Sequence, residues 1–316
     1  MCVPRKLRVQ YPGAIYHVMN RGDRREDIFY DDQDRRRFLQ TLGQACEKTG
    51  WQIHAYCLMS NHFHLVVETP QPNLVPGMKW MLGTYTIRFN RRHKEFGHLF
   101  SGRYKALPVD GSTTGYLKTV CDYVHLNPVR AGLLTQGQLL AVYPWSSYGE
   151  YLKAPSQRLA WLRPHRLLGE WGIPKDSSAG RQRFAQVMEE RRAQEGKDAD
   201  WRAVERGWCV GSKEFKAELL QQMRERRADH YGSELREADE EHAEGLVRQE
   251  LRRRGWKEAE LAERRKGDPE KVQIAWRLRQ ETTMTLKWIA RRLQMGTWTN
   301  VSNRLVEKRK QEEKCK

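Results

Sequence analysis

The 316-residue sequence lacks the features that mark several protein classes. Its six cysteines include no CxxC pair, so neither a structural zinc site nor a disulfide framework is indicated, which fits a reducing compartment. No apolar run approaches the ~20 residues that a membrane span needs. The opening residues, MCVPRKLRVQ, have no apolar stretch behind their basic residues, unlike a signal peptide. We therefore expect a cytoplasmic protein with no membrane partner.

Acidic residues are in deficit. Lys and Arg number 57 against 40 Asp and Glu, a formal net charge of +17. This excess suits a polyanionic partner, because each Lys or Arg near a phosphate releases counterions. A basic soluble protein with no nucleic-acid partner would have the same charge, so the charge alone leaves both interpretations open.

The first 150 residues alternate between strand-like and helix-like patterns. The residues Ser60-Asn61 form a polar pair between two strand candidates, a pattern typical of a hairpin. The resulting order is strand, helix, strand, strand, helix, strand, helix. It predicts an α+β, ferredoxin-like fold, a four-stranded antiparallel sheet with helices on one face. The expected strands are 14–22, 51–59, 62–69 and 102–110, and the expected helices are 31–50, 73–93 and 112–127.

The rest of the chain is poor in strand formers and is expected to be α-helical. Residues 138–178 favour an irregular wrap, and residues 181–267 favour charged, solvated helices. Residues 268–310 suggest three short helices, and the pattern TLKWIARRLQM, GTWT, NVSNRLVEKRK is similar to a helix-turn-helix. An ordinary helical hairpin fits it too. We expect domains at 1–150, 151–267 and 268–316, with Arg304, Lys308 and Arg309 on one DNA-binding face.

The segment His62-Phe63-His64 is a candidate metal site. Alternate side chains of a strand point to the same face, so His62 and His64 point together and Phe63 points the other way. Two imidazoles a few ångströms apart can bind a divalent metal. A pair of surface or hydrogen-bonded histidines would show the same sequence.

Tyr123 and Asn127 lie four residues apart on an expected helix, hence on one face. A tyrosine hydroxyl with a pKa near ~10 becomes an effective nucleophile when a cation makes the phosphorus more electrophilic. Asn127 could supply a third metal ligand, or it could cap a helix that starts at Pro128. Tyr116, seven residues earlier, is the rival nucleophile, and a packed core tyrosine is the alternative for Tyr123.

Four motifs in this order resemble the REP-associated tyrosine transposases, relatives of the insertion-sequence transposases in the HUH nuclease superfamily. They are YPGAIYHVMNRGDRREDIF (11–29), MSNHFHLVVETP (59–70), FNRRHKEFGHLFSGRYKA (89–106) and YVHLNPVRAGL (123–133). The resemblance implies a ferredoxin-like fold and Mg²⁺ or Mn²⁺ bound by His62 and His64. It also implies that Tyr123 attacks DNA, leaving a 5′-phosphotyrosine and a free 3′-hydroxyl. Insertion-sequence members usually carry Gln where this chain has Asn127. Because those members are dimers whereas REP-associated relatives can act as monomers, the oligomeric state stays open.

The expected function is therefore cutting and rejoining of single-stranded DNA at hairpin, REP-like sequences. The alternative is a domesticated, sequence-specific DNA-binding regulator that no longer cuts. A small-molecule phosphodiesterase is disfavoured, because a carboxylate-rich ligand set is missing. Around the motifs, Phe96, His98, Phe100 and Tyr104 offer surfaces for base stacking. The expected DNA-binding residues of this region, several of which could instead be solvated helix charges, are Arg21, Arg91, Arg92, Arg103, Lys105 and Arg130.

Overall fold

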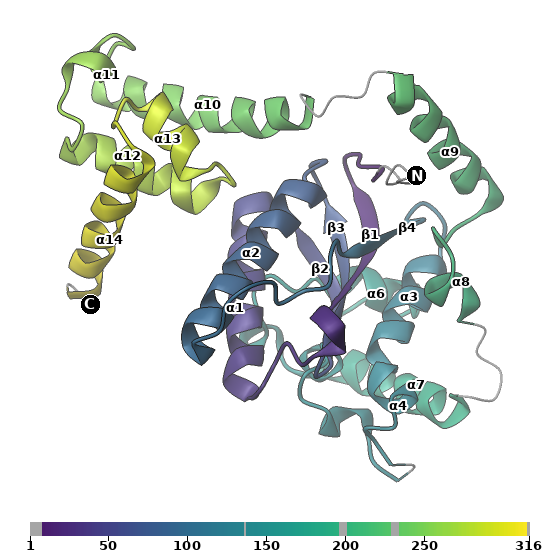
Figure 1. Cartoon of the computed structure of the whole chain (residues 1–316). Helices are drawn as coiled ribbons and strands as arrows, with labels where there is room; N and C mark the ends of the chain where they lie inside the picture. The colour runs from purple at the N-terminus through teal and green to yellow at the C-terminus, as the bar shows by residue number, and fades with distance from the viewer. Residues whose placement is uncertain (1–7, 136, 196–200, 229–233, 315–316) are drawn as a thin grey trace. The chain divides into compact units, whose positions relative to one another are not determined.

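A computed structural model describes residues 8–135, 137–195, 201–228 and 234–314 (Figure 1). The chain divides into two compact units, the first mainly the residues up to 228 and the second mainly residues 234–314. The domain boundaries expected after residues 150 and 267 stay a prediction. None of the helices in the described ranges is both long and apolar enough to cross a membrane.

The first unit is built on the predicted antiparallel sheet. Its strands lie in the order β2-β3-β1-β4, so β3 and β1 are central. The β2–β3 hairpin turns at Ser60-Asn61, where the Met59 amide donates to the carbonyl of His62 at 2.9 Å. The order and connections are those of a ferredoxin-like fold, which confirms the predicted class. The strands are β1 (Ala14–Arg21), β2 (Gln52–Leu58), β3 (His62–Thr69) and β4 (Lys105–Val109).

Two long helices, α1 (Asp32–Thr49) and α2 (Leu74–His93), cover one face of this sheet. The ring of Phe38 from α1 lies 4.9 Å from that of Phe63 in β3 and 5.1 Å from that of Tyr85 in α2. These aromatic side chains form the core between helices and sheet. The sequence predicted the helices of this region on a single face of the sheet; α1 and α2 share one face, but the next helix lies on the other.

A further helix, α3 (Tyr116–His125), packs on the opposite face of the sheet. Leu117, Val120 and Val124 are fully buried there. The sheet thus has a helical layer on each side, and α3 faces the side chains that point away from Phe63.

Later segments cover both edges of the sheet. Along β2, the Leu58 amide donates to the carbonyl of Trp145 at 2.9 Å, and the Arg163 amide donates to Ile53 at 2.8 Å. Along β4, the Val210 amide donates to Pro108 at 2.9 Å. These bonds satisfy backbone N–H and C=O groups of the edge strands, which could otherwise pair with strands of another chain. They also connect the segments around Arg163 and Val210 to the sheet.

The charged helix α7 (Ser178–Gln194) is not the solvated helix that we expected. Phe184 and Met188 are fully buried, and the Phe184 ring stacks at 5.0 Å on that of Tyr151. Apolar residues at helical spacing among the charges bury one face. The other helices of this unit are α4 (Asn127–Arg130), α5 (Tyr148–Leu152), α6 (His165–Glu170), α8 (Arg202–Glu205) and α9 (Lys213–Ala228).

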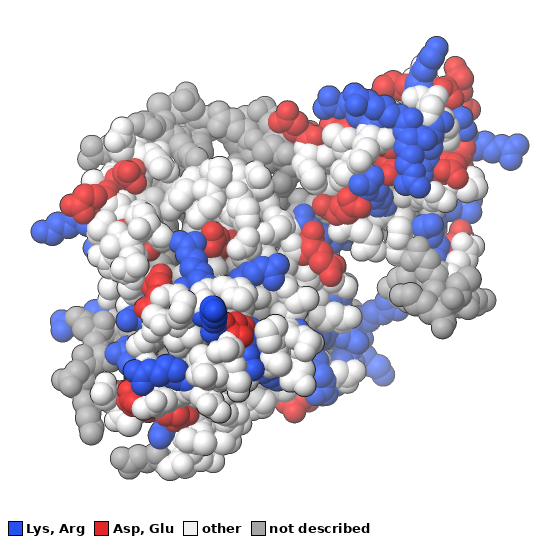
Figure 2. All heavy atoms as spheres, turned by 180° about the vertical axis from the view of Figure 1, so that it is seen from behind, with Lys and Arg blue, Asp and Glu red and all other residues white. Residues whose placement is uncertain are grey.

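The C-terminal unit has an apolar core of its own. Val247 and Leu251 of the first of its helices are buried together with Ile274, Ile289 and Val301 from the later ones. This first helix, α10 (Glu234–Arg254), was also expected to be solvated, but its apolar face is part of this core. On the outside of the C-terminal unit, basic and acidic side chains alternate over the surface (Figure 2). The helices are α10 (Glu234–Arg254), α11 (Glu260–Glu263), α12 (Pro269–Glu281), α13 (Leu286–Arg292) and α14 (Trp298–Lys314).

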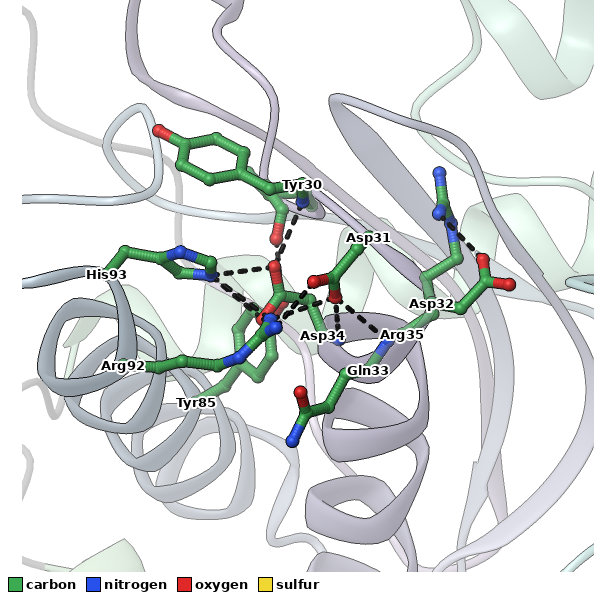
Figure 3. A network of polar contacts seen from close by, with 10 residues as sticks. Tyr30, Asp31, Asp32, Gln33, Asp34, Arg35, Tyr85, Arg92 and His93 are labelled. Atoms are coloured by element: carbon green, nitrogen blue, oxygen red, sulfur yellow. Dashed lines mark hydrogen bonds and ion pairs between the residues drawn. The ribbon is translucent and has the colours of Figure 1, made fainter.

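A polar network joins the start of α1 to the end of α2 (Figure 3). The Asp34 carboxylate, only 1% exposed, binds the Arg92 guanidinium at 2.5 Å and the His93 imidazole at 2.9 Å. It also accepts the amide of Tyr30 at 3.0 Å. Arg92 makes a second ion pair with Asp31. Arg92, an expected DNA contact, is therefore held in an ion-pair network in this structure.

We expect Asp34→Asn to lower the free energy of unfolding by about 3 kcal/mol, because it removes one charge from a buried network and leaves the Arg92 charge short of a partner. Chemical denaturation measures this. The control is Asp32→Asn, whose carboxylate is 61% exposed and 3.4 Å from Arg35, and which should cost less than about 1 kcal/mol. Equal losses in the two variants would contradict the assignment of Asp34 to a stabilising network.

Candidate active site

The two histidines of β3 lie on the face of the sheet that α3 covers. The rings of His62 and His64 are 5.1 Å apart and inclined at 79°. The Tyr123 ring of α3 lies 5.8 Å from that of His64. Strand alternation therefore brings both imidazoles to the Tyr123 side, as the sequence indicated.

Burial keeps both imidazoles neutral. The His62 pKa is lowered to about 4, first by burial and then by the nearby charge of Arg21. The His64 ring, 3% exposed, has a pKa well below its ordinary value, again mainly through burial. A neutral imidazole has one nitrogen with a free lone pair, which is the form that binds a metal.

A hydrogen bond determines which nitrogen of His62 carries the proton. Its Nδ1 lies 2.7 Å from the side-chain oxygen of Asn61, and an amide oxygen can only accept. Nδ1–H is therefore the donor, and Nε2 of His62 keeps its lone pair for a ligand.

A third histidine, His17, belongs to the site and was missed from the sequence. Its Nε2 lies 2.9 Å from Nδ1 of His64, and the two rings are stacked at 5.1 Å and 18°. The pairing of Met19 with His64 across β1 and β3 places His17 diagonally beside His64. The only clue in the sequence is one histidine in an otherwise apolar strand pattern.

The Tyr123 side chain is largely buried, with 7% exposed. Besides the histidine rings, it contacts the ring of Trp201 at 5.5 Å and the Arg130 guanidinium, which lies 3.7 Å above its centroid. Burial raises the pKa of Tyr123, and the Arg130 charge opposes that rise in part. The phenol is therefore protonated at neutral pH.

Trp201 and Glu195 complete this environment, and neither was expected from the sequence. The Trp201 indole N–H donates to Glu195 Oε1 at 2.8 Å, and the same oxygen lies 3.5 Å from Arg130 Nη1. Arg130 also donates to the backbone carbonyl of Tyr123 at 2.7 Å. Arg130 thus adjoins the nucleophile candidate, with its charge balanced by Glu195.

Asn127 and Tyr116, also named from the sequence, lie at the ends of helices. Asn127 is buried and begins α4, after α3 ends and the helix is interrupted at Leu126. Within the described chain, α4 has no side-chain cap, so the capping alternative for Asn127 is not supported. Tyr116 starts α3, roughly 10 Å along the helix axis from Tyr123 at 1.5 Å per residue.

The two imidazoles of His62 and His64 fit a divalent cation that binds nitrogen ligands. His62 and His64 provide two imidazoles, ligands that suit transition metals such as Mn²⁺ better than Mg²⁺. Among the described residues, no group of three or more His, Cys, Asp or Glu side chains could hold a metal ion. A cation at the two imidazoles would therefore keep positions for water and for a substrate oxygen.

The expected DNA-binding residues of the first unit fall into two groups. Arg92 and Arg130 are engaged in internal contacts, as described above. The rest are exposed. Arg21 ends β1 directly opposite His62, and Lys105 begins β4 opposite Met19. The exposed members are Arg21, Arg91, Arg103 and Lys105.

Residues 10–127 match the family described as Transposase IS200 like. This part of the chain is similar to the IS200-like transposases. The matched range contains His17, His62, His64 and Tyr123, so the four side chains that converge in the structure all lie inside it. The resemblance inferred from the sequence motifs is confirmed.

Several solved structures are similar to the chain. A structure described as a REP-associated tyrosine transposase bound to a REP hairpin has a TM-score of 0.38 and 14% identity, over 47% of this chain and 84% of that chain. No curated protein matches the chain significantly.

Proposed function

We propose that this transposase cuts and rejoins single-stranded DNA through Tyr123, with a divalent cation held by His62 and His64. The observation that supports this most is the convergence of the three side chains, with the Tyr123 ring 5.8 Å from that of His64. They come from a central strand and from the helix that covers it, two rigid elements that can hold a reactive geometry.

The chemistry is one exchange of phosphodiester bonds. The Tyr123 hydroxyl oxygen attacks a backbone phosphorus, a P–O bond to tyrosine forms, and the P–O3′ bond breaks. The phenol loses its proton and the departing 3′ oxygen gains one. Reversal by a 3′-hydroxyl rejoins the strand. The number of phosphodiester bonds does not change, so no ATP is consumed.

His62 and His64 would hold the cation, and Mn²⁺ or Mg²⁺ bound there would stabilise the charge that develops on the phosphate oxygens. The chain's own residues orient the reaction. Tyr123 is fixed between the histidine rings and Trp201, and Arg130 provides a positive charge next to the phenol. That charge favours loss of the phenol proton.

The direct test uses labelled single-stranded hairpin oligonucleotides from the flanks of the protein's own gene, with Mg²⁺ or Mn²⁺. We expect a protein–DNA adduct that survives boiling in detergent and that carries the DNA on the 3′ side of the cut. Failure to detect it on every hairpin with either metal would support the alternative of a regulator that binds without cutting. One observation favours that alternative: the ring of Trp201 packs against the ring of Tyr123 at 5.5 Å.

A tight turn next to His62 is suited to hold the DNA backbone. Arg24 and Arg25 are exposed, with left-handed backbone angles of φ 50° and 67°. The turn starts at Gly22, where a Cβ would lie 2.0 Å from the carbonyl oxygen of Glu26. Asn61 Nδ2 donates to the Arg25 carbonyl at 3.0 Å, so the turn is anchored to the neighbour of His62. Two arginines are thus displayed on a strained turn beside the candidate cation site.

An aromatic residue projects from the adjacent loop. Phe96 is 98% exposed, whereas Phe100 and Tyr104 are each 8% exposed and cannot stack on bases as expected from the sequence. The loop is fixed at both sides, since Asn90 Nδ2 donates to the Gly97 carbonyl at 3.1 Å and Asp23 donates its amide to Leu99 at 3.0 Å. Phe96 is therefore a pre-positioned surface for an unpaired base.

We expect Phe96→Ala to weaken binding of single-stranded DNA by about 1–3 kcal/mol, roughly 5- to 150-fold, through loss of one stacking contact. Fluorescence anisotropy at one fixed salt concentration measures it. The control is Ile87→Ala, another exposed apolar side chain of the same unit, 69% exposed on α2. An equal loss in the control variant would show a general effect on the surface and count against Phe96.

The C-terminal unit ends in the predicted helix pair. α13 and α14 are joined by a turn in which Gly296 has φ 82°, a left-handed angle that glycine adopts readily. Arg304 is exposed on α14, within 3.1 Å of Glu307, and Lys308 is half-buried one turn later. The side chain of Arg309 lies outside the described residues. We propose that this unit is a helix-turn-helix module that binds paired DNA, with α14 as the recognition helix.

We expect Arg304→Ala with Lys308→Ala to weaken binding to the paired stem of a hairpin and to reduce the salt dependence by about two phosphate contacts. Cleavage of a short unpaired strand should be unchanged. The matched control removes two exposed charges from α10 of the same unit, Arg248→Ala with Arg252→Ala, and should affect stem binding less. Equal effects of the two double variants would indicate non-specific attraction and exclude a recognition surface on α14.

A further inference from the structure

His17 is not explained by the stability of the fold. It is fully buried, and in the described chain its Nδ1 has no hydrogen-bond partner. A buried polar group without a partner costs about 1–3 kcal/mol, at least as much as one ordinary hydrogen bond contributes. Ile15 and Met19 share its face of β1, so an apolar residue would suit this position better if packing were the only requirement.

The one hydrogen bond that His17 makes is directed at His64. His17 Nε2 and His64 Nδ1 are 2.9 Å apart, within hydrogen-bond distance, so one of the two nitrogens donates a proton to the other. If His17 donates, His64 carries its own proton on Nε2 and cannot bind a cation through that atom. If His17 accepts, His64 Nδ1–H is the donor and Nε2 is free.

The arrangement around His62 shows the same requirement. There, the Asn61 oxygen accepts from Nδ1 and leaves Nε2 free. Histidines that bind metals generally donate their other ring N–H to an acceptor, which fixes the tautomer and the ring orientation. The ring of His17 is also in edge contact with Tyr123 at 5.6 Å, so it adjoins both partners of the proposed reaction.

We infer that His17 is a positioning residue of the transposase: it accepts the hydrogen bond of His64 Nδ1–H and so holds His64 in the tautomer that binds the cation. The inference rests on the proposed function of His64. It assigns His17 no contact with DNA and no proton transfer in the reaction.

The first test reads the tautomer in the wild-type protein loaded with Mg²⁺. Long-range ¹H–¹⁵N correlation spectra of protein labelled in histidine distinguish the protonated ring nitrogen, and His64→Ala identifies the resonance. We expect His64 to carry its proton on Nδ1. A proton on Nε2 would overturn the inference without any substitution at position 17.

The second test measures Mn²⁺ binding without DNA, by titration calorimetry. His17→Leu removes the acceptor and should weaken binding about 10- to 100-fold, whereas His17→Gln places an amide oxygen near the position of Nε2 and should restore it. The control is His125→Leu. His125 is likewise fully buried, with one hydrogen bond, to Ser147 at 2.8 Å, and an unpaired Nδ1, and its loss should leave Mn²⁺ affinity unchanged.

The outcomes separate the two proposals. Absence of Mn²⁺ binding by the wild type, or equal binding by His64→Ala, would overturn the proposed function and this inference with it. Binding by the wild type that His64→Ala abolishes and His17→Leu leaves intact would overturn the role of His17 alone. Failure of folded His17→Gln to restore binding would show that packing, not the hydrogen-bond acceptor, is what His17 provides.

Discussion

Tyr123→Phe is expected to abolish covalent attachment to DNA while leaving DNA affinity and fold intact. The substitution removes only the hydroxyl oxygen that would form the bond to phosphorus. The ring keeps its contacts with His64 at 5.8 Å and with Trp201 at 5.5 Å. The loss should be complete, because phenylalanine offers no atom that can attack. The measurement is a detergent-resistant gel shift with DNA labelled on the 3′ side of the cut.

Tyr116→Phe is the matched control for this experiment. Tyr116 lies on the same helix but two turns earlier, so its substitution should leave adduct formation close to wild type. The opposite result, an adduct with Tyr123→Phe and none with Tyr116→Phe, would transfer the nucleophile to Tyr116. The similarity to the IS200-like transposases would not be affected, because the match spans residues 10–127 as a whole.

Those parts of the site that depend on local rules could be predicted from the sequence. The side-chain alternation of a strand places His62 and His64 on one face whatever β3 pairs with. The hairpin at Ser60-Asn61 and the spacing of the helices gave the order of elements, and with it the sheet topology. Tyr123 was named from the family resemblance and its spacing to Asn127, whereas the position of its helix on the other face of the sheet was not predicted.

The parts that were missed depend on contacts between distant segments. His17 reaches His64 only through the register of β1 on β3, where Met19 pairs with His64. Trp201 meets Tyr123 from far along the chain, and its surroundings in the sequence are charged and unpatterned. A basic residue near a motif was likewise not enough to identify a DNA contact. Arg92 pairs with Asp31 and Asp34, partners that no short-range pattern reveals.

His64→Ala is expected to reduce cleavage by about 1000-fold or more. A bound cation contributes several kcal/mol of charge stabilisation in the transition state, and each 1.36 kcal/mol corresponds to a factor of ten in rate. His64 is 3% exposed, so its side chain faces the interior of the site and not the solvent. Single-turnover cleavage of a hairpin oligonucleotide at saturating protein measures the rate separately from binding.

The control for this experiment is His54→Ala. His54 is also a buried histidine of the sheet, 1% exposed, but it pairs with Glu68 at 2.8 Å rather than with the site. Its loss should reduce thermal stability and leave the single-turnover rate of the folded protein within about threefold, since it contributes nothing to charge stabilisation at the phosphate. High Mn²⁺ should partly restore cleavage by His64→Ala, because His62 still offers one imidazole, and should not affect Tyr123→Phe. Rescue of both variants, or of neither, would mean that His64 does not act through a cation.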